Sequence, residues 1–289
     1  MARINLLGVT VGVLSLASAL IFALRDARPR RVHPVTLPEP APLAFDELAI
    51  RAGLHDLAPG WGLSWTDADC DGDPDLFISN HLHYPSYLYS NEGGVSFARS
   101  ETKLGDQVDL DDHLGVWFDV DLDGYPDLYT ANGYHRVDHL MVNVGPGEYA
   151  DRAEQYGLVH GELSRGRSAL WADLDGDRWL DLVVFSFLTP DLLYVRKPNG
   201  GFEERSLDSG FGNSLPKEGG IAGDVDNDGD LDLYLPVLAG SLRNALYLNR
   251  GDATFVGPRS GPVSTSQERR TARLSATLTM TAISTCSWP

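Results

Sequence analysis

An acidic ten-residue string recurs four times in this chain of 289 residues and constrains its fold more than any other feature. The four copies begin at Asp67, Asp119, Asp173 and Asp224, which are separated by 52, 54 and 51 residues. Self-similarity at a constant period is the signature of a repeat architecture, in which each unit covers the apolar face of its neighbour. We therefore expect residues 44–258 to consist of similar units of about 52 residues.

Each string is followed by a short run of aromatic and β-branched residues, such as Phe77-Ile78, and this composition favours a strand. A second shared element, typified by Leu88-Tyr89-x-Asn91, leads through glycines to an aromatic residue. No stretch has a helical period of useful length. The sequence predicts an all-β fold with about four strands per unit, which is the size of one β-propeller blade.

A third element has the form aromatic-x-acid-x-small-x-x-x-Gly-apolar; it is clearest in residues 45–54 and 149–158 and weaker in 202–211. Three tryptophans, Trp65, Trp117 and Trp171, each lie two residues before the first aspartate of their string. We predict that all three pack in the core between neighbouring blades.

The acidic string has the composition of a metal-binding loop. Counted from its first aspartate, carboxylates lie at positions 1, 3, 5 and 9, and three of the four copies have glycine at position 6. Alternate carboxylates in a tight loop can converge on one point, together with the backbone carbonyl of position 7. Hard oxygen ligands in this number suit Ca²⁺ better than Mg²⁺, which demands a stricter octahedron. The predicted metal ligands are Asp67, Asp69, Asp71, Asp73, Asp75, Asp119, Asp121, Asp123, Tyr125, Asp127, Asp173, Asp175, Asp177, Trp179, Asp181, Asp224, Asp226, Asp228, Asp230 and Asp232.

Two other interpretations of the string are weaker. An EF-hand needs a glutamate at position 12, where the four copies have Ile78, Thr130, Val184 and Leu235. A solvated turn would also be rich in Asp and Gly, but four copies in register crowd carboxylates that repel one another without a cation. We predict four structural calcium sites, the weakest in the third copy because Arg178 replaces its glycine.

The charge balance excludes some function classes. The chain has 23 Lys and Arg against 41 Asp and Glu, a formal charge of −18, which argues against nucleic-acid binding. Eighteen of the acids lie in the four strings, so much of the charge is ligand charge rather than a docking surface. The two cysteines, Cys70 and Cys286, make neither a disulfide framework nor a cysteine-based zinc site.

The N-terminal segment predicts export. Residues 4–24 form an uncharged apolar run long enough to span a bilayer, so residues 1–31 are a signal peptide or a membrane anchor. Four arginines after the run would favour a cytoplasmic C-terminal side, but calcium sites need an extracytoplasmic environment, so we rank export first. Residues 32–43 are a proline-rich linker. The expected location is periplasmic, cell-surface or secreted.

The strings D-x-D-x-D-G-x-x-D-L, joined by L-Y-x-N-x-G-x-x-F, resemble the FG-GAP or VCBS repeats of the integrin α-subunit N-terminal β-propeller. Bacterial relatives of this group include cartilage-acidic-protein-like proteins that often end in an ASPIC/UnbV domain. The resemblance covers residues 45–258. It implies a seven-bladed propeller with calcium in hairpin loops, at Asp67, Asp69, Asp71, Asp75 and their equivalents, in exported proteins used for adhesion or for carbohydrate and protein contact.

Seven such blades need far more residues than this chain provides, and its C-terminal end departs from the repeat. After Phe255 the sequence becomes rich in Ser, Thr and Arg. If the codons of residues 271–286 are read with a one-base shift, they are compatible with a fifth acidic string. We therefore interpret residues 259–289 as an out-of-frame tail of a longer propeller gene; an unrelated low-complexity tail is the alternative.

No catalytic constellation is present, since G-x-S-x-G and H-E-x-x-H are both missing, and we predict that the chain is not an enzyme. His83 and His135 lie on equivalent loops, but ordinary loop polarity explains them. The loops 81–86 and 133–138 carry Tyr, His and Arg, which suit contact with a glycan or protein. The alternatives are a propeller-type polysaccharide lyase or hydrolase, or a scaffold for a missing C-terminal domain.

Overall fold

The computed structural model describes residues 46–257 apart from 56–57, 82–83, 102–103, 105–110, 134–136, 146, 160–164, 213 and 239–242. The predicted signal or anchor (1–31), the linker (32–43) and the predicted out-of-frame tail (259–289) lie outside the described residues. Within the described part, no helix is both long and apolar enough to cross a bilayer. The described residues from 48 onward belong to one compact unit.

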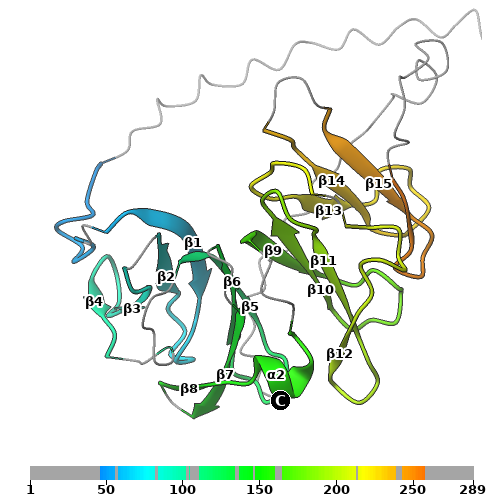
Figure 1. Cartoon of the computed structure of the whole chain (residues 1–289). Coiled ribbons are helices and arrows are strands. Elements are labelled where there is room, and N and C mark those ends of the chain that lie inside the picture. Colours follow the sequence, from blue (N-terminus) through cyan, green and yellow to red (C-terminus); the bar gives the residue numbers. More distant parts are fainter. Residues whose placement is uncertain are drawn as a thin grey trace, which may run out of the picture. The chain divides into compact units, whose positions relative to one another are not determined.

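Within the described residues, sixteen strands form four antiparallel four-stranded sheets, and each sheet is built from consecutive strands (Figure 1). Blade 1 comprises β1 (Gly60–Thr66), β2 (Asp75–Asn80), β3 (Tyr87–Asn91) and β4 (Phe97–Arg99). Blade 2 comprises β5 (Asp112–Phe118), β6 (Asp127–Asn132), β7 (His139–Gly145) and β8 (Glu148–Asp151), followed by the short helix α2 (Ala153–Tyr156). Blade 3 comprises β9 (Gly166–Ala172), β10 (Asp181–Ser186), β11 (Leu192–Arg196) and β12 (Phe202–Glu204). Blade 4 comprises β13 (Ile221–Gly223), β14 (Asp232–Leu235), β15 (Ala245–Asn249) and β16 (Phe255–Val256).

The sheets pack face to face in chain order, as propeller blades do. The first strand β5 contacts both β1 and β9, and β10 is buried along its whole length because a neighbouring blade covers each of its faces. One apolar core joins blades 1 and 2 through Phe77 and Leu128, a second joins blades 2 and 3, and a third joins blades 3 and 4 through Phe185 and Leu233. The predicted all-β fold of propeller blades is confirmed.

Two of the three tryptophans pack between blades as predicted. The Trp117 ring lies edge-on to Phe77 of blade 1, 6.0 Å between centroids, and Trp171 lies edge-on to Tyr129 of blade 2 at 6.2 Å. The prediction for Trp65 is wrong, because its side chain is 56% exposed and its ring contact is with Phe97 of its own blade. Blade 1 is the first described blade, so no earlier described blade covers the face on which Trp65 lies.

The third sequence element connects successive blades through one glycine. Gly53, Gly157 and Gly210 all have positive φ, at +88°, +80° and +73°. A Cβ atom added to each would lie 2.1, 2.8 and 2.8 Å from a backbone carbonyl oxygen at the first residue of an outer strand: Phe97, Phe202 and Phe255 respectively. For Gly157 and Gly210 that strand belongs to the following blade. The motif therefore requires glycine for both its backbone conformation and its close approach.

Replacing Gly157 with alanine is expected to lower the free energy of unfolding by more than the same change at Gly200. Gly200 has a similar φ of +87°, but an added Cβ would meet nothing within 4 Å, so only the backbone penalty of about 1 kcal/mol applies there. At Gly157 the contact with the Phe202 carbonyl adds about 1–3 kcal/mol of overpacking. Urea unfolding of the two variants measures the difference, and equal losses would contradict the role assigned to the connecting motif.

Candidate metal centres

The first aspartate of each acidic string organises its loop. Asp119 accepts hydrogen bonds from the backbone N–H groups of Asp123, at 3.1 Å, and Gly124, at 2.9 Å. These bonds close the turn between β5 and β6, and turns of this kind are typical of Asp and Gly. Asp67 accepts the equivalent pair of bonds from positions 5 and 6, whereas Asp173 and Asp224 accept theirs from the N–H groups of positions 4 and 6.

The aspartate at position 9 joins the loop to the middle of its blade. The Asp127 carboxylate is buried, and it accepts the N–H of Val120 at 2.7 Å and the N–H of Asn143, on β7, at 2.8 Å. Burial raises the pKa of Asp127 to about 7 although both hydrogen bonds favour the ionised form. The other position-9 residues, Asp75, Asp181 and Asp232, accept the same two N–H groups of their own blades.

In blades 2, 3 and 4, a further hydrogen bond links the third strand to the acidic loop of the preceding blade. The Asn143 side chain of blade 2 donates to the position-2 carbonyl Ala68, at 3.5 Å, and the Asn249 side chain of blade 4 donates to Leu174 at 2.8 Å. In blade 3, where the L-Y-x-N element lacks its asparagine, the Arg196 guanidinium donates to the Val120 carbonyl at 2.5 Å. The order of each acidic loop is therefore coupled to the interface with the next blade.

Carboxylates converge within each loop. Oxygen atoms from positions 1, 3 and 9 lie within 4.8 Å of one another in the second, third and fourth loops, and those from positions 1, 3 and 5 do so in the first. Burial and repulsion from neighbouring carboxylates raise the pKa of the position-3 residues Asp69, Asp121 and Asp175. The donors are all hard oxygen atoms whose crowding a cation would relieve, and this chemistry fits calcium.

The position-5 carboxylates also accept hydrogen bonds that shape the turn. At position 5, Asp123 accepts the backbone N–H of Tyr125 at 2.9 Å, which holds the second half of the turn. The corresponding bonds run from Asp73 to Asp71, from Trp179 to Asp177 and from Asp230 to Asp228.

Each loop contains two residues of positive φ, where the sequence predicted one. Position 6 was expected from its glycines, and Arg178 does adopt the left-handed conformation there, at +75°. Position 4 was missed: its residues are Cys70, Leu122, Gly176 and Asn227, with φ between +59° and +75°. The third loop therefore has its glycine at position 4 and its strained residue at position 6.

Replacing Leu122 with asparagine is expected to raise the free energy of unfolding by up to about 1 kcal/mol. Leu122 is 58% exposed and has a φ of +61°. Its replacement therefore removes little packing, whereas leucine at this position carries the conformational cost of a left-handed backbone. Asparagine tolerates this conformation, and Asn227 already occupies the same position in the fourth loop. Thermal melts at constant calcium measure the gain; a Leu122→Ala variant, which keeps the penalty, should show none.

The gain in stability from calcium is expected to be larger at about pH 8 than at about pH 6. Burial raises the pKa of Asp127 and Asp181 to about 7, above their ordinary value, so protonation of these groups favours the metal-free fold. The contribution of these protonated carboxyl groups to the stability of the metal-free fold is complete at low pH and is lost as the pH rises through about 7. Calcium, in contrast, is expected to bind the ionised carboxylates. The difference in Tm with and without chelator, measured at both pH values, should grow with pH; a constant difference would contradict this linkage.

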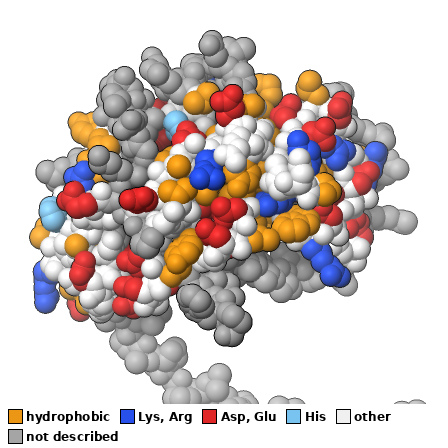
Figure 2. Space-filling model, turned by 90° about the horizontal axis from the view of Figure 1, so that it is seen from below, with side chains coloured by type: hydrophobic (Ala, Val, Ile, Leu, Met, Phe, Trp, Pro, Cys, Tyr) orange, Lys and Arg blue, Asp and Glu red, His pale blue; other side chains and the backbone are white. Residues whose placement is uncertain are grey.

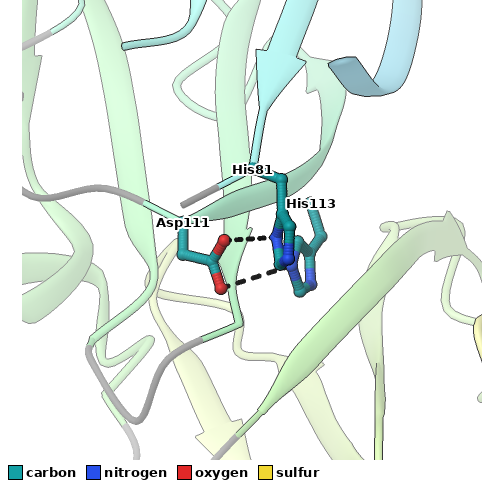
Figure 3. A group of neighbouring side chains, drawn as sticks. All are labelled: His81, Asp111 and His113. Carbon is teal, nitrogen blue, oxygen red and sulfur yellow. Dashed lines mark hydrogen bonds and ion pairs between the residues drawn. The ribbon is translucent and has the colours of Figure 1, made fainter. Parts of the chain in front are cut away.

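The histidines that drew attention in the sequence, His83 and His135, lie outside the described residues. A different group of side chains comes together where the blades meet: His81, which follows β2, and Asp111 and His113 at the start of β5 (Figure 3). The His81 Nδ1 atom lies 2.5 Å from one oxygen of Asp111, and the His113 Nε2 atom lies 3.4 Å from the other. No sequence motif marks this group, because His81 lies 30 residues before Asp111 and only blade packing brings it to Asp111 and His113.

The comparisons with known proteins agree with the repeat. A family model described as "FG-GAP-like repeat" matches residues 119–184 and 173–235, so each match runs from one acidic string through the next. Cartilage acidic protein 1 of Mus musculus is 26% identical over 226 residues, and the match covers 74% of this chain and 34% of the relative. The human protein is equally similar, with 33% of its length covered. The chain thus spans about a third of the length of these curated relatives.

Among solved structures, this chain is similar to BBS1N in a complex with ARL6DN, with a TM-score of 0.41 and 15% identity over 70% of this chain and 56% of the other. It is also similar to the biofilm matrix protein Bap1 of V. cholerae, with a TM-score of 0.39 and 14% identity over 68% of this chain and 30% of the other. The chain thus has two matches to the FG-GAP-like repeat model and is similar, at 26% identity, to cartilage acidic protein 1.

Proposed function

We propose that this chain is an exported calcium-binding propeller module that contacts a glycan or protein ligand, and that its calcium is structural. The observation that carries the proposal is the repeated loop, in which converging carboxylates are hydrogen-bonded to the third strand and, through it, to the preceding blade. A cation there would stiffen the blade and its interface together. Neither the matching family description nor the names of the curated relatives describe an enzyme.

A cavity beside α2 is the proposed ligand contact. It has a volume of about 680 Å³, which is in the range of ligand pockets, and Val137, Asp138, Arg152 and Glu154 contribute to its lining. Val137 and Asp138 end the loop 133–138 that the sequence singled out for binding. Acidic side chains are spread over the face in Figure 2 rather than gathered into one patch, so charge alone does not mark a docking surface.

Retention on glycan and protein arrays tests this proposal. Binding should require calcium, and it should be weakened by Arg152→Glu at the cavity but not by the matched charge reversal Arg250→Glu in blade 4. A ligand retained equally by both variants would place the contact elsewhere. Absence of any retention would favour the scaffold function, and turnover of an acidic polysaccharide, with His83→Ala as control, would favour a lyase or hydrolase.

The export and truncation proposals have separate tests. Residues 4–24 would act as a signal or a membrane anchor, and N-terminal sequencing of the protein from membrane and soluble extracytoplasmic fractions distinguishes the two.

Additional blades are supported by a cross-strand row of partly exposed apolar side chains on blade 4, formed by Ile221, Tyr234 and Leu246. The coding sequence beyond codon 255 should continue the acidic repeat in the shifted frame; third bases that do not spell it would refute the frameshift.

A further inference from the structure

We propose that His81, Asp111 and His113 bind one divalent transition-metal ion of the zinc class, at a site separate from the acidic loops. The three residues come from two blades, and their side chains point toward one another (Figure 3). Two imidazoles and one carboxylate are a donor set that transition metals prefer, whereas the all-oxygen loops suit calcium. The proposal does not depend on the calcium sites.

The spacing of the donor atoms fits a common ion. The His81 Nδ1 atom lies 3.1 Å from the His113 Nε2 atom, and the two nitrogens lie 2.5 and 3.4 Å from the Asp111 oxygens. Ligands at about 2.1 Å from one metal are about 3.0 Å apart in octahedral and about 3.4 Å apart in tetrahedral geometry. Among these three donor spacings, only the His81–Asp111 distance must lengthen for one ion to bind all three side chains.

The surroundings orient His113 as a ligand. Its Nδ1 atom lies 2.8 Å from the carbonyl oxygen of Gly166, which can only accept, so Nδ1 carries the proton and Nε2 keeps its lone pair toward Asp111 and His81. A ligating histidine characteristically donates its other ring N–H in this way. The ring is fully buried, and a Cβ atom on Gly133 would lie 2.0 Å from its Cε1 atom, so the fold leaves it little freedom.

The remaining described neighbours of the site are an aromatic ring and a pair of charged side chains. Trp61 stacks on His113 with 4.7 Å between ring centroids and lies 4.8 Å from His81, whose side chain is 28% exposed. One Arg167 guanidinium nitrogen lies 2.6 Å from the His113 Nδ1 atom and 2.7 Å from its Nε2 atom, where it competes with a cation. The Glu218 carboxylate lies 3.5 Å from the Arg167 Nε atom and offsets part of this charge. An incoming ion therefore displaces Arg167 from Nε2.

Metal titration of the full chain in saturating calcium tests the proposal. Calorimetry with Zn²⁺ should show about one equivalent bound, and Co²⁺ should develop the visible absorption of a site with nitrogen ligands. His81→Asn, at the partly exposed ligand, should weaken zinc binding at least ~10-fold. His139→Asn is the matched control, because the His139 Nδ1 atom also lies 2.7 Å from a carboxylate, that of Asp151, but has no second histidine in that ion pair.

Circular dichroism shows whether both variants are folded. A folded His81→Asn protein that still binds zinc like the wild type would overturn the proposal. No zinc uptake by the wild-type chain would overturn it as well. Equal losses in His81→Asn and His139→Asn would do the same, since they would assign the bound zinc to scattered surface groups.

Discussion

Removing calcium with a chelator is expected to lower the free energy of unfolding by about 6 kcal/mol. A site with a dissociation constant of ~10⁻⁴ M in ~1 mM calcium stabilises the fold by about 1.4 kcal/mol, and four loops contribute independently to first order. The loss is comparable with the whole stability of an ordinary domain. The metal-free chain should therefore be close to unfolded at physiological temperature.

The effect of calcium removal should reach beyond the loops, because Asn143, Arg196 and Asn249 bond blades 2, 3 and 4 to the acidic loop of the preceding blade. Loss of order in one loop breaks its hydrogen bond to the next blade, so the calcium-free protein should lose its blade interfaces as well. Near-ultraviolet circular dichroism, which reports on the interfacial Trp117 and Trp171, should decay together with the far-ultraviolet signal. A Tm unchanged by chelator would contradict a structural role for calcium.

Replacing Asp127 with asparagine is expected to destabilise the protein by about 2–3 kcal/mol, both with and without calcium. The two carboxylate oxygens accept the N–H groups of Val120 and Asn143, and an asparagine side chain offers only one acceptor oxygen. The remaining N–H stays buried and unpaired, which accounts for the cost. With calcium present, the loss of one predicted ligand adds to the effect.

Asp121→Asn in the same loop is the matched control and should behave differently. The Asp121 residue as a whole is exposed, but its carboxyl group is partly desolvated, and this desolvation together with repulsion from Asp123 and Asp119 raises its pKa. Without calcium, removing this charge relieves repulsion and should stabilise the fold; with calcium, it should cost about 1.4 kcal/mol through loss of one site. Chemical denaturation of both variants with calcium and with chelator gives the comparison. The same sign for Asp121→Asn under both conditions would argue against cation binding in this loop.

The sequence was sufficient for the fold and for the acidic loops because both depend on local, repeated signals. The strings marked each turn between the first and second strands, and alternation of glycine turns with β-branched runs predicted four strands per unit. The third element was recognised as a pattern, but its purpose was not, since the close approach of Gly157 to Phe202 joins residues of different blades.

Features that depend on neighbouring blades could not be predicted from the sequence. Trp65 occupies the same register as Trp117 and Trp171, yet it is exposed because its environment is set by the covering blade rather than by its own strand. The left-handed residues at position 4 were missed because Leu122 and Cys70 carry no glycine signal. The group of His81, Asp111 and His113 likewise exists only once two blades are packed together.

The number of calcium ions bound per chain tests the central claim most directly. Equilibrium dialysis of the metal-free protein against calcium, followed by elemental analysis, should give four ions per chain. Each loop holds one non-glycine residue of positive φ, so Arg178 gives the third loop no more such residues than Cys70 or Leu122 give the first and second, and the expectation of a weaker third site loses its physical reason. Binding of no calcium, or of a single ion, would contradict the account of the four acidic strings as calcium loops.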